Sequence, residues 1–203
     1  MPEQLVLPGF EAAPPARRPS AGLARPKQTH ALFFALFPDP GTAARIAERA
    51  DGLRAAHGLR GTPLKAGRLH VTLQYLGQCI ELPPEMVEAA KAAAAVLAMP
   101  PFEVVLDQAL TFDQNPRCPL VLRASDGAPG VTALQRLLHA VLVDVGFRKL
   151  VGHPAHMTLA YRSAHLPQQM LEPIRWQARE FVLVHSHVGL GVHEPLSRWP
   201  LRA

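Results

Sequence analysis

The chain has 203 residues, of which 48% are hydrophobic, and a formal net charge of +5. This length allows one domain of ordinary size or two small lobes that share a core, and no apolar run is long enough to span a bilayer. Two cysteines are too few for a disulfide framework, and the N-terminus lacks the pattern of an export signal, so we expect a cytoplasmic protein.

The first 27 residues are rich in proline, alanine and arginine and include the run Arg17-Arg18-Pro19. Such a composition cannot bury a hydrophobic core. We therefore expect residues 1–27 to be a disordered tail ahead of a single bilobal domain at 28–203. The many arginines suit planar contacts with phosphate, although net charge alone does not establish a nucleic-acid ligand.

The first part of the domain predicts a strand, a helix and a second strand. An apolar run predicts a strand at 30–37, and apolar residues at helical spacing predict a helix at 42–57, ended by Gly58. A turn-rich connection at 59–67 follows. A run rich in Leu, Val, Thr and Tyr then predicts a buried strand at 69–77.

The middle of the chain alternates between the two kinds of element. Proline in the first turn predicts a helix at 84–97, and alternating apolar residues predict strands at 102–110 and 120–124. A leucine stripe at i, i+3 and i+4 predicts a helix at 131–145, capped by Gly146. A basic loop covers 147–154.

The last part predicts strands at 155–161 and 181–190, with a connection between them that starts near Leu166. The strands are short, and several neighbours lack a helical crossover between them. This order is typical of an α+β protein with antiparallel sheets, outer helices and an approximate internal duplication.

Two similar tetrapeptides, His70-Val71-Thr72-Leu73 and His156-Met157-Thr158-Leu159, lie in apolar strands a little under half the chain length apart. Side chains two residues apart on a strand share a face, so each histidine lies beside its threonine. A single His-x-Thr is more often a half-buried polar pair than a site. Two copies favour a site in which two imidazoles and two hydroxyls surround one phosphate.

The two residue types suit phosphoryl chemistry. An imidazole titrates near neutral pH, so one ring can take a proton from an attacking oxygen while the other gives one to the leaving oxygen. The threonine hydroxyls would donate hydrogen bonds to the non-bridging oxygens, where negative charge grows. This chemistry requires neither a metal nor another cofactor.

The chain resembles the 2H phosphoesterase superfamily, and within it the RNA 2′,3′-cyclic phosphodiesterases, also called 2′-5′ RNA ligases. Besides the two His-x-Thr-Leu motifs, the resemblance depends on the segments 32–36, 75–77, 180–186 and 198–201. It covers about residues 28 to 202. It implies a bilobal, pseudo-duplicated fold in which antiparallel sheets line a central cleft and the helices lie outside.

The same resemblance implies an activity and the roles of four residues. The reaction would be hydrolysis of RNA or oligonucleotide 2′,3′-cyclic phosphate ends to 2′-phosphates, reversible as 2′-5′ ligation. His70 would be the proton donor and His156 the proton acceptor, and Thr72 and Thr158 would bind the phosphate. The partner would be an RNA end, and the protein would be a monomer without a membrane association.

Several other residues are candidates for binding the substrate. Members of the family often carry an arginine just after the second motif, whereas here Tyr161 fills that position and Arg162 follows it. A shift of one residue on a strand turns a side chain to the other face, so a loop cation is an alternative to Arg162. Tyr75 is a candidate for stacking on a base, and Phe34 is a weaker one because a core role suits it better. The candidate cations lie in the loops before the two motifs: Arg60, Lys65, Arg68, Arg148 and Lys149.

The sequence leaves two other functions open and argues against a metal site. A metal site is not expected, because Pro154 separates His153 from His156, and the pair His185 and His187 has no evident carboxylate or thiol partner. A non-catalytic module that grips an RNA end would use the same motifs. A phosphodiesterase for small cyclic nucleotides would use them as well.

Overall fold

The computed structural model describes residues 29–112 and 118–203. The predicted tail at 1–27 and part of the segment between the predicted strands at 102–110 and 120–124 lie outside these residues. In the described part, nine strands form one sheet, eight of them in the order β7-β4-β5-β6-β3-β1-β8-β9. Every neighbouring pair along this path is antiparallel.

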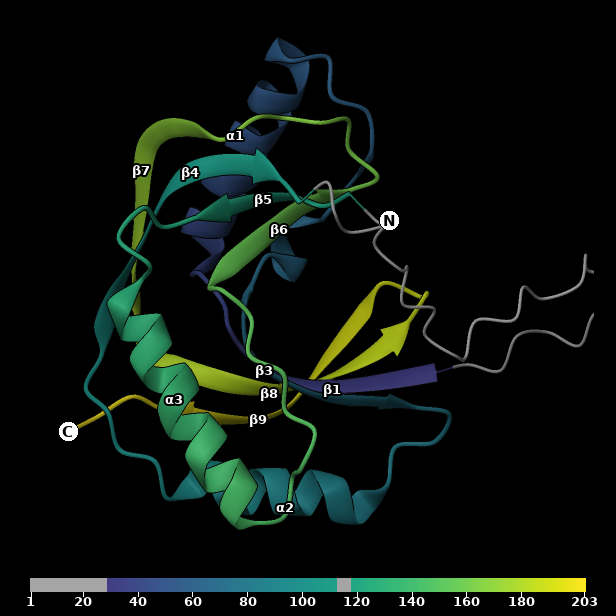
Figure 1. The fold of residues 1–203 in the computed structure, drawn as a ribbon, viewed down its shortest axis with the longest axis vertical. Coiled ribbons are helices and arrows are strands. Elements are labelled where there is room, and N and C mark those ends of the chain that lie inside the picture. The colour runs from purple at the N-terminus through teal and green to yellow at the C-terminus, as the bar shows by residue number, and fades with distance from the viewer. Residues whose placement is uncertain (1–28, 113–117) are drawn as a thin grey trace, which may run out of the picture.

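The sheet consists of two halves that lie one above the other in Figure 1. The lower half contains β1 (Thr29–Leu36), β3 (Val71–Cys79), β8 (Glu180–Val188) and β9 (Val192–Pro200). The upper half contains β4 (Phe102–Thr111), β5 (Leu120–Arg123), β6 (His156–Tyr161) and β7 (Gln169–Ala178), with β2 (Thr62–Pro63) paired to β6. The innermost strands, β3 and β6, pair only at Val71 and Met157.

Within the same described residues, three α-helices lie outside the sheet. α1 (Pro40–Ala56) contacts β7 and the 3-10 turn η1 (Ala66–Arg68). α2 (Pro84–Ala95) contacts β9. α3 (Pro129–Asp144) contacts β3. Figure 1 shows α2 and α3 together at the lower half. The arrangement confirms the predicted α+β fold with antiparallel sheets and outer helices. In the part of the chain that the structure describes, no helix combines the length and the apolar character that a membrane span requires.

The local sequence explains where α1 begins. The Asp39 carboxylate accepts a hydrogen bond from the Thr42 main-chain nitrogen at 2.9 Å, and Pro40 occupies the first helical position. A carboxylate cap satisfies a free N–H of the first turn, and proline there loses no hydrogen bond. The helix therefore starts two residues before the predicted Thr42. Its apolar face buries Ile46 and Ala50.

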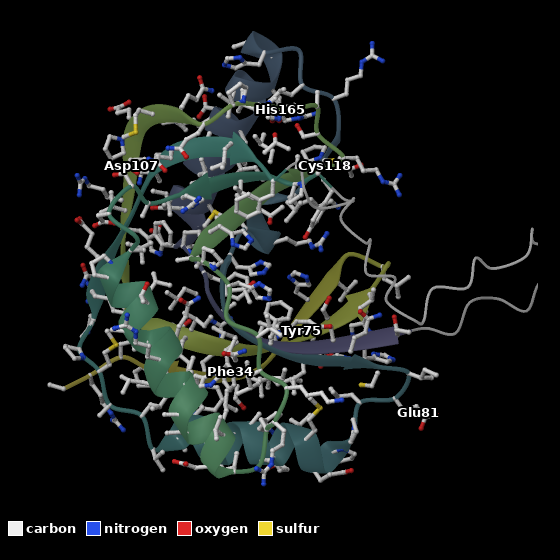
Figure 2. All side chains as sticks on the ribbon, viewed as in Figure 1. Phe34, Tyr75, Glu81, Asp107, Cys118 and His165 are labelled. Carbon is white, nitrogen blue, oxygen red and sulfur yellow. The ribbon has the colours of Figure 1, made fainter. Side chains whose placement is uncertain are left out.

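The strand β1 is buried on both faces. Phe34 is fully buried and packs near Phe181 and Trp199, whereas Phe33 on the opposite face packs against Val182 and Val184. Figure 2 shows Phe34 on the side of the sheet toward α2 and Tyr75 in the space between the two halves. Phe34 therefore belongs to the core rather than to a base-stacking surface.

Two long strands were missing from the sequence prediction. β7 lies where only a connection was expected, because Pro173 and several exposed residues interrupt its alternating pattern. β9 forms a hairpin with β8, and the predicted strand at 181–190 ends two residues early, before Gly189 and Gly191 at φ of 87° and 68°. Glycine adopts these positive φ angles without strain. With β9 in place, the lower half contains both the first strand and the last two, so the halves are interleaved along the chain.

Candidate active site

The single pairing between β3 and β6 brings the two motifs together. Because the strands are antiparallel and Val71 pairs with Met157, His70 stands opposite Thr158 and Thr72 opposite His156. Val71 and Met157 are both fully buried, so the four polar side chains of the motifs project from the other face of the sheet. The predicted pairing of the two histidine–threonine motifs is thus present at the junction of the halves.

His70 immediately precedes β3 and is anchored through its Nδ1 atom. This atom lies 2.7 Å from the main-chain oxygen of Arg68. A carbonyl only accepts, so Nδ1 carries the proton and Nε2 keeps its lone pair. The Phe33 ring stacks on the imidazole with centroids 5.1 Å apart.

The surroundings of His70 strongly disfavour its charged form. Burial lowers its pKa from 6.5 to about 4, opposed by the Arg68 carbonyl and reinforced by the positive charges of Arg68 and His156. The ring is therefore neutral at pH 7 when the site holds no anion. An incoming negative charge would raise this pKa, because it favours the imidazolium.

His156 is held in the same way from the other half. Its Nδ1 atom lies 2.8 Å from the main-chain oxygen of Pro154, again two residues upstream, and the Phe112 ring lies 5.1 Å from its own. Burial lowers the pKa of His156, opposed by the Pro154 carbonyl, with smaller contributions from the charges of His153 and Arg123. Both histidines thus offer an unprotonated Nε2 atom.

A cleft of about 720 Å³ lies against the first motif. His70, Thr72 and Tyr75 line it from the lower half, and His153 and Tyr161 line it from the upper half. His156 and Thr158 are outside the set of residues that line this cavity. Their place beside it follows from the register of β6 against β3.

The predicted cations differ in where they lie. Arg68 lines the cleft. Arg60, Lys65, Arg148, Lys149 and Arg162 are exposed and do not line it. Arg162 follows the end of β6 with a left-handed φ of 56°, so the backbone turns away there instead of continuing the strand. Of these cations, the structure brings only Arg68 to His70.

Three further residues at the site have no signal in the sequence pattern. His193 of β9 lies 5.3 Å from the His70 ring, and Arg123 pairs across the strands with His156. Gln135 of α3 donates to the main-chain oxygens of Thr72 at 3.2 Å and His153 at 3.3 Å, which connects the two halves. His193 was not found because β9 was not predicted.

Arg68 and His193 form a half-buried polar pair with unused hydrogen-bonding capacity. Arg68 Nη2 lies 3.3 Å from His193 Nε2, and since a guanidinium only donates, Nε2 must accept and the proton resides on Nδ1. Burial, together with the charges of His70 and Arg68, lowers the pKa of His193 to about 4. Within the described residues, Arg68 Nε and His193 Nδ1 are buried without a hydrogen-bond partner. Both are donors that an anionic oxygen could satisfy.

Comparisons with known proteins indicate the family of the chain. A family model described as the 2′-5′ RNA ligase superfamily matches residues 38–190. A search of curated proteins finds no match.

Several solved structures are similar to this chain over most of its length. Escherichia coli LigT in its apo form is 26% identical with a TM-score of 0.68, and the match covers 87% of this chain and 99% of LigT. E. coli LigT complexed with 3′-AMP is 24% identical with a TM-score of 0.71, covering 86% and 99%. A protein of Thermus thermophilus is 25% identical with a TM-score of 0.68, covering 85% and 98%. Because the family model spans most of the chain, and the fold agrees with it, the protein belongs to the 2′-5′ RNA ligase superfamily of 2H phosphoesterases.

Proposed function

We propose that the protein hydrolyses the 2′,3′-cyclic phosphate ends of RNA or oligonucleotides to 2′-phosphates. The observation that carries this proposal is the matched pair of imidazoles on β3 and β6. Each has its Nδ1 atom anchored by the carbonyl two residues upstream, which leaves Nε2 to exchange a proton. In this proposal residues 28–203 form the catalytic domain and act as a monomer.

The proposed reaction is an in-line displacement at phosphorus. His156 takes a proton from water as the water oxygen bonds to phosphorus, and His70 gives a proton to the 3′-oxygen as its bond to phosphorus breaks. In the free protein His70 is neutral and has no proton to give. The negative phosphate stabilises its imidazolium form and thereby raises its pKa. The same displacement with a 5′-hydroxyl in place of water bonds that oxygen to phosphorus, releases the 3′-oxygen and gives a 2′-5′ linkage.

The groups around the histidines fit the remaining requirements. Thr72 and Thr158 stand opposite His156 and His70, where their hydroxyls can donate to the non-bridging oxygens. The unpaired donors of Arg68 and His193 would bind the same phosphate. Tyr75 lines the cleft and would stack on the terminal base.

Two of the other predicted cations have a more distant role in this proposal. Arg148 and Arg162 are exposed and outside the cleft lining, so they would contact only the phosphates of a longer RNA. Support for a nucleotide ligand comes from E. coli LigT, which has been crystallised with 3′-AMP and with phosphate.

One assay separates this function from its alternatives. The purified protein is incubated, in the presence of a chelator, with an oligonucleotide that ends in a 2′,3′-cyclic phosphate and, separately, with nucleoside 2′,3′-cyclic monophosphates. We expect a 2′-phosphate product, formed faster from the oligonucleotide. Tight binding without product would favour an RNA-end binding module, and turnover restricted to mononucleotides would favour a small cyclic-nucleotide phosphodiesterase.

A further inference from the structure

Three histidines gather at the end of the lower half of the sheet, where β1, β8 and β9 lie side by side. His30 of β1 pairs with His187 of β8, and His185 is two residues from His187, so their side chains share a face. One nitrogen from each of the three rings can be chosen such that all three lie within 4.8 Å of one another. This cluster consists of different residues from the His70–His156 pair.

A carboxylate from the third strand completes the arrangement. Glu194 of β9 pairs with His185, and its Oε2 atom lies 3.5 Å from His185 Nδ1 and 3.4 Å from His187 Nε2. On its other side, His185 Nε2 lies 2.7 Å from His30 Nδ1. One nitrogen of His185 thus faces a carboxylate while the other faces a second imidazole. Metal-binding histidines are oriented in this way by a carboxylate behind the ring.

We propose that His30, His185 and His187 bind one divalent transition-metal ion, Zn²⁺ or a close relative, with Glu194 positioning His185. Three neutral imidazole nitrogens suit Zn²⁺, Cu²⁺ or Ni²⁺ and do not suit Mg²⁺ or Ca²⁺, which prefer oxygen ligands. The fourth coordination position is left to water or to an oxygen of a ligand.

The geometry requires only a small adjustment to accept the ion. Ligands at about 2.0–2.1 Å from a tetrahedral zinc are roughly 3.3 Å apart, so His30 Nδ1 and His185 Nε2 must separate slightly from their present hydrogen-bonding distance. The side chains are accessible enough for an ion to enter, with exposed fractions of 13% for His185 and 27% for His187. His187 also lines the large cleft, so the ion would lie at its rim.

The sequence pattern did not predict this site. His185 and His187 had no partner within their own strand, and both partners come from distant segments. Only the antiparallel pairing of β1 and β9 with β8 brings His30 and Glu194 to them.

The experiment measures metal binding directly in the full-length protein without a histidine tag. Titration with Zn²⁺ by calorimetry should show one equivalent bound, and Co²⁺ should give the visible absorption bands of a four- or five-coordinate site. Zn²⁺ should also raise the melting temperature, because an ion that binds only the folded state stabilises it. Mg²⁺ in excess should not compete.

Matched variants assign the ion to the cluster. His185→Gln and His187→Gln should lose the bound equivalent, and Glu194→Gln should weaken affinity about 10-fold to 100-fold. His70→Ala with His156→Ala should bind Zn²⁺ as the wild type does. Absence of one-equivalent binding in the wild type, or unchanged binding in the His185 and His187 variants, would overturn the proposal. Loss of binding in the His70 and His156 variant would also overturn it, because the ion would then lie in the cleft. None of these readouts depends on phosphodiesterase turnover.

Discussion

His70 and His156 are anchored alike but have different surroundings. In both halves the Nδ1 atom faces the carbonyl two residues upstream, and a phenylalanine ring lies 5.1 Å from the imidazole. On the His70 side, Arg68 and His193 crowd a ring whose pKa falls to about 4. On the His156 side, burial is the main cause of a smaller lowering of the pKa, to which the charges of His153 and Arg123 add.

This difference shows what the internal duplication repeats and what it does not. Both halves repeat the same backbone arrangement, in which the Nδ1 atom of the histidine faces the main-chain oxygen two residues upstream. The charges and the burial around each ring come from non-equivalent elements: β9 supplies His193 on one side, and β5 supplies Arg123 on the other. In the free protein this asymmetry makes His156 the more easily protonated ring, so the proposed donor role of His70 requires the bound phosphate to raise its pKa.

Removing either imidazole tests whether both halves are needed. We expect His70→Ala and His156→Ala each to lower kcat roughly 10²–10⁴-fold, because each removes one of the two proton transfers. The measurement is steady-state hydrolysis of a cyclic-phosphate oligonucleotide. His139→Ala, an exposed histidine on α3, is the matched control and should be unaffected. Near-normal turnover by either motif variant would contradict the two-histidine mechanism.

The second prediction uses the pH dependence of stability to separate the two rings. His70 is neutral in the folded protein down to about pH 4, whereas the unfolded chain protonates it near 6.5. Stability is therefore fully present above pH 6.5 and falls as the pH drops toward 4. The full loss from His70 is on the order of 3 kcal/mol, taking 1.36 kcal/mol for each of the roughly 2.5 pKa units.

Urea unfolding at pH 7 and pH 4.5 measures this loss. In His70→Gln the decrease in the free energy of unfolding between the two pH values should be smaller than in the wild type. His156→Gln should show a weaker effect of the same sign, since its pKa is lowered less. An equal effect in both variants would mean that the two surroundings do not differ as described.

Unlike the two histidines, the two threonines should contribute equally to catalysis. Thr72 and Thr158 occupy matched positions across the β3–β6 pair. Each Thr→Val substitution removes one hydrogen bond to a charged oxygen, for which about 1.5–3 kcal/mol predicts a 10-fold to 100-fold lower kcat/KM. Threonine-to-serine variants, which keep the hydroxyl, should retain most of the activity. A large effect at only one threonine would show that the phosphate binds to that motif alone and not between the two.

Substitution of Arg68 tests whether the charged surroundings of His70 contribute to substrate binding. Arg68→Gln should raise KM about tenfold, because it removes a half-buried cation from the cleft. Arg148→Gln is the matched control, as its side chain is exposed and outside the cleft lining. With a mononucleotide substrate the control should match the wild type. Equal effects of the two variants would remove Arg68 from the phosphate site.

The smallest expected effect is the position of the pH optimum. Both motif histidines have a lowered pKa, so the singly protonated pair is most populated below pH 6.5. The bell-shaped profile of kcat/KM should therefore have its maximum on the acidic side of 6.5 and fall as the pH rises. A maximum above pH 7.5 would show that the rings titrate more freely than their burial implies.

The sequence alone predicted most of the elements and the central residue pairs. The alternating apolar pattern located the strands that carry His70 and His156, and capping residues located the helices to within a few residues. The two-residue spacing placed each threonine beside its histidine. Because these features depend on neighbours along the chain, local physical chemistry was sufficient to predict them.

Only the tertiary structure decided what surrounds these residues. β7 and β9 have exposed, interrupted patterns and are strands because of the partners with which they pair. The pairing of β9 brings His193 to His70 and Glu194 to His185, and the return of β6 to β3 sets His70 opposite Thr158. Charge, burial and proton affinity at a site depend on groups that are close in space but distant in sequence. The sequence therefore determined which residues carry the chemistry, and the tertiary fold determined how differently the two histidines hold their protons.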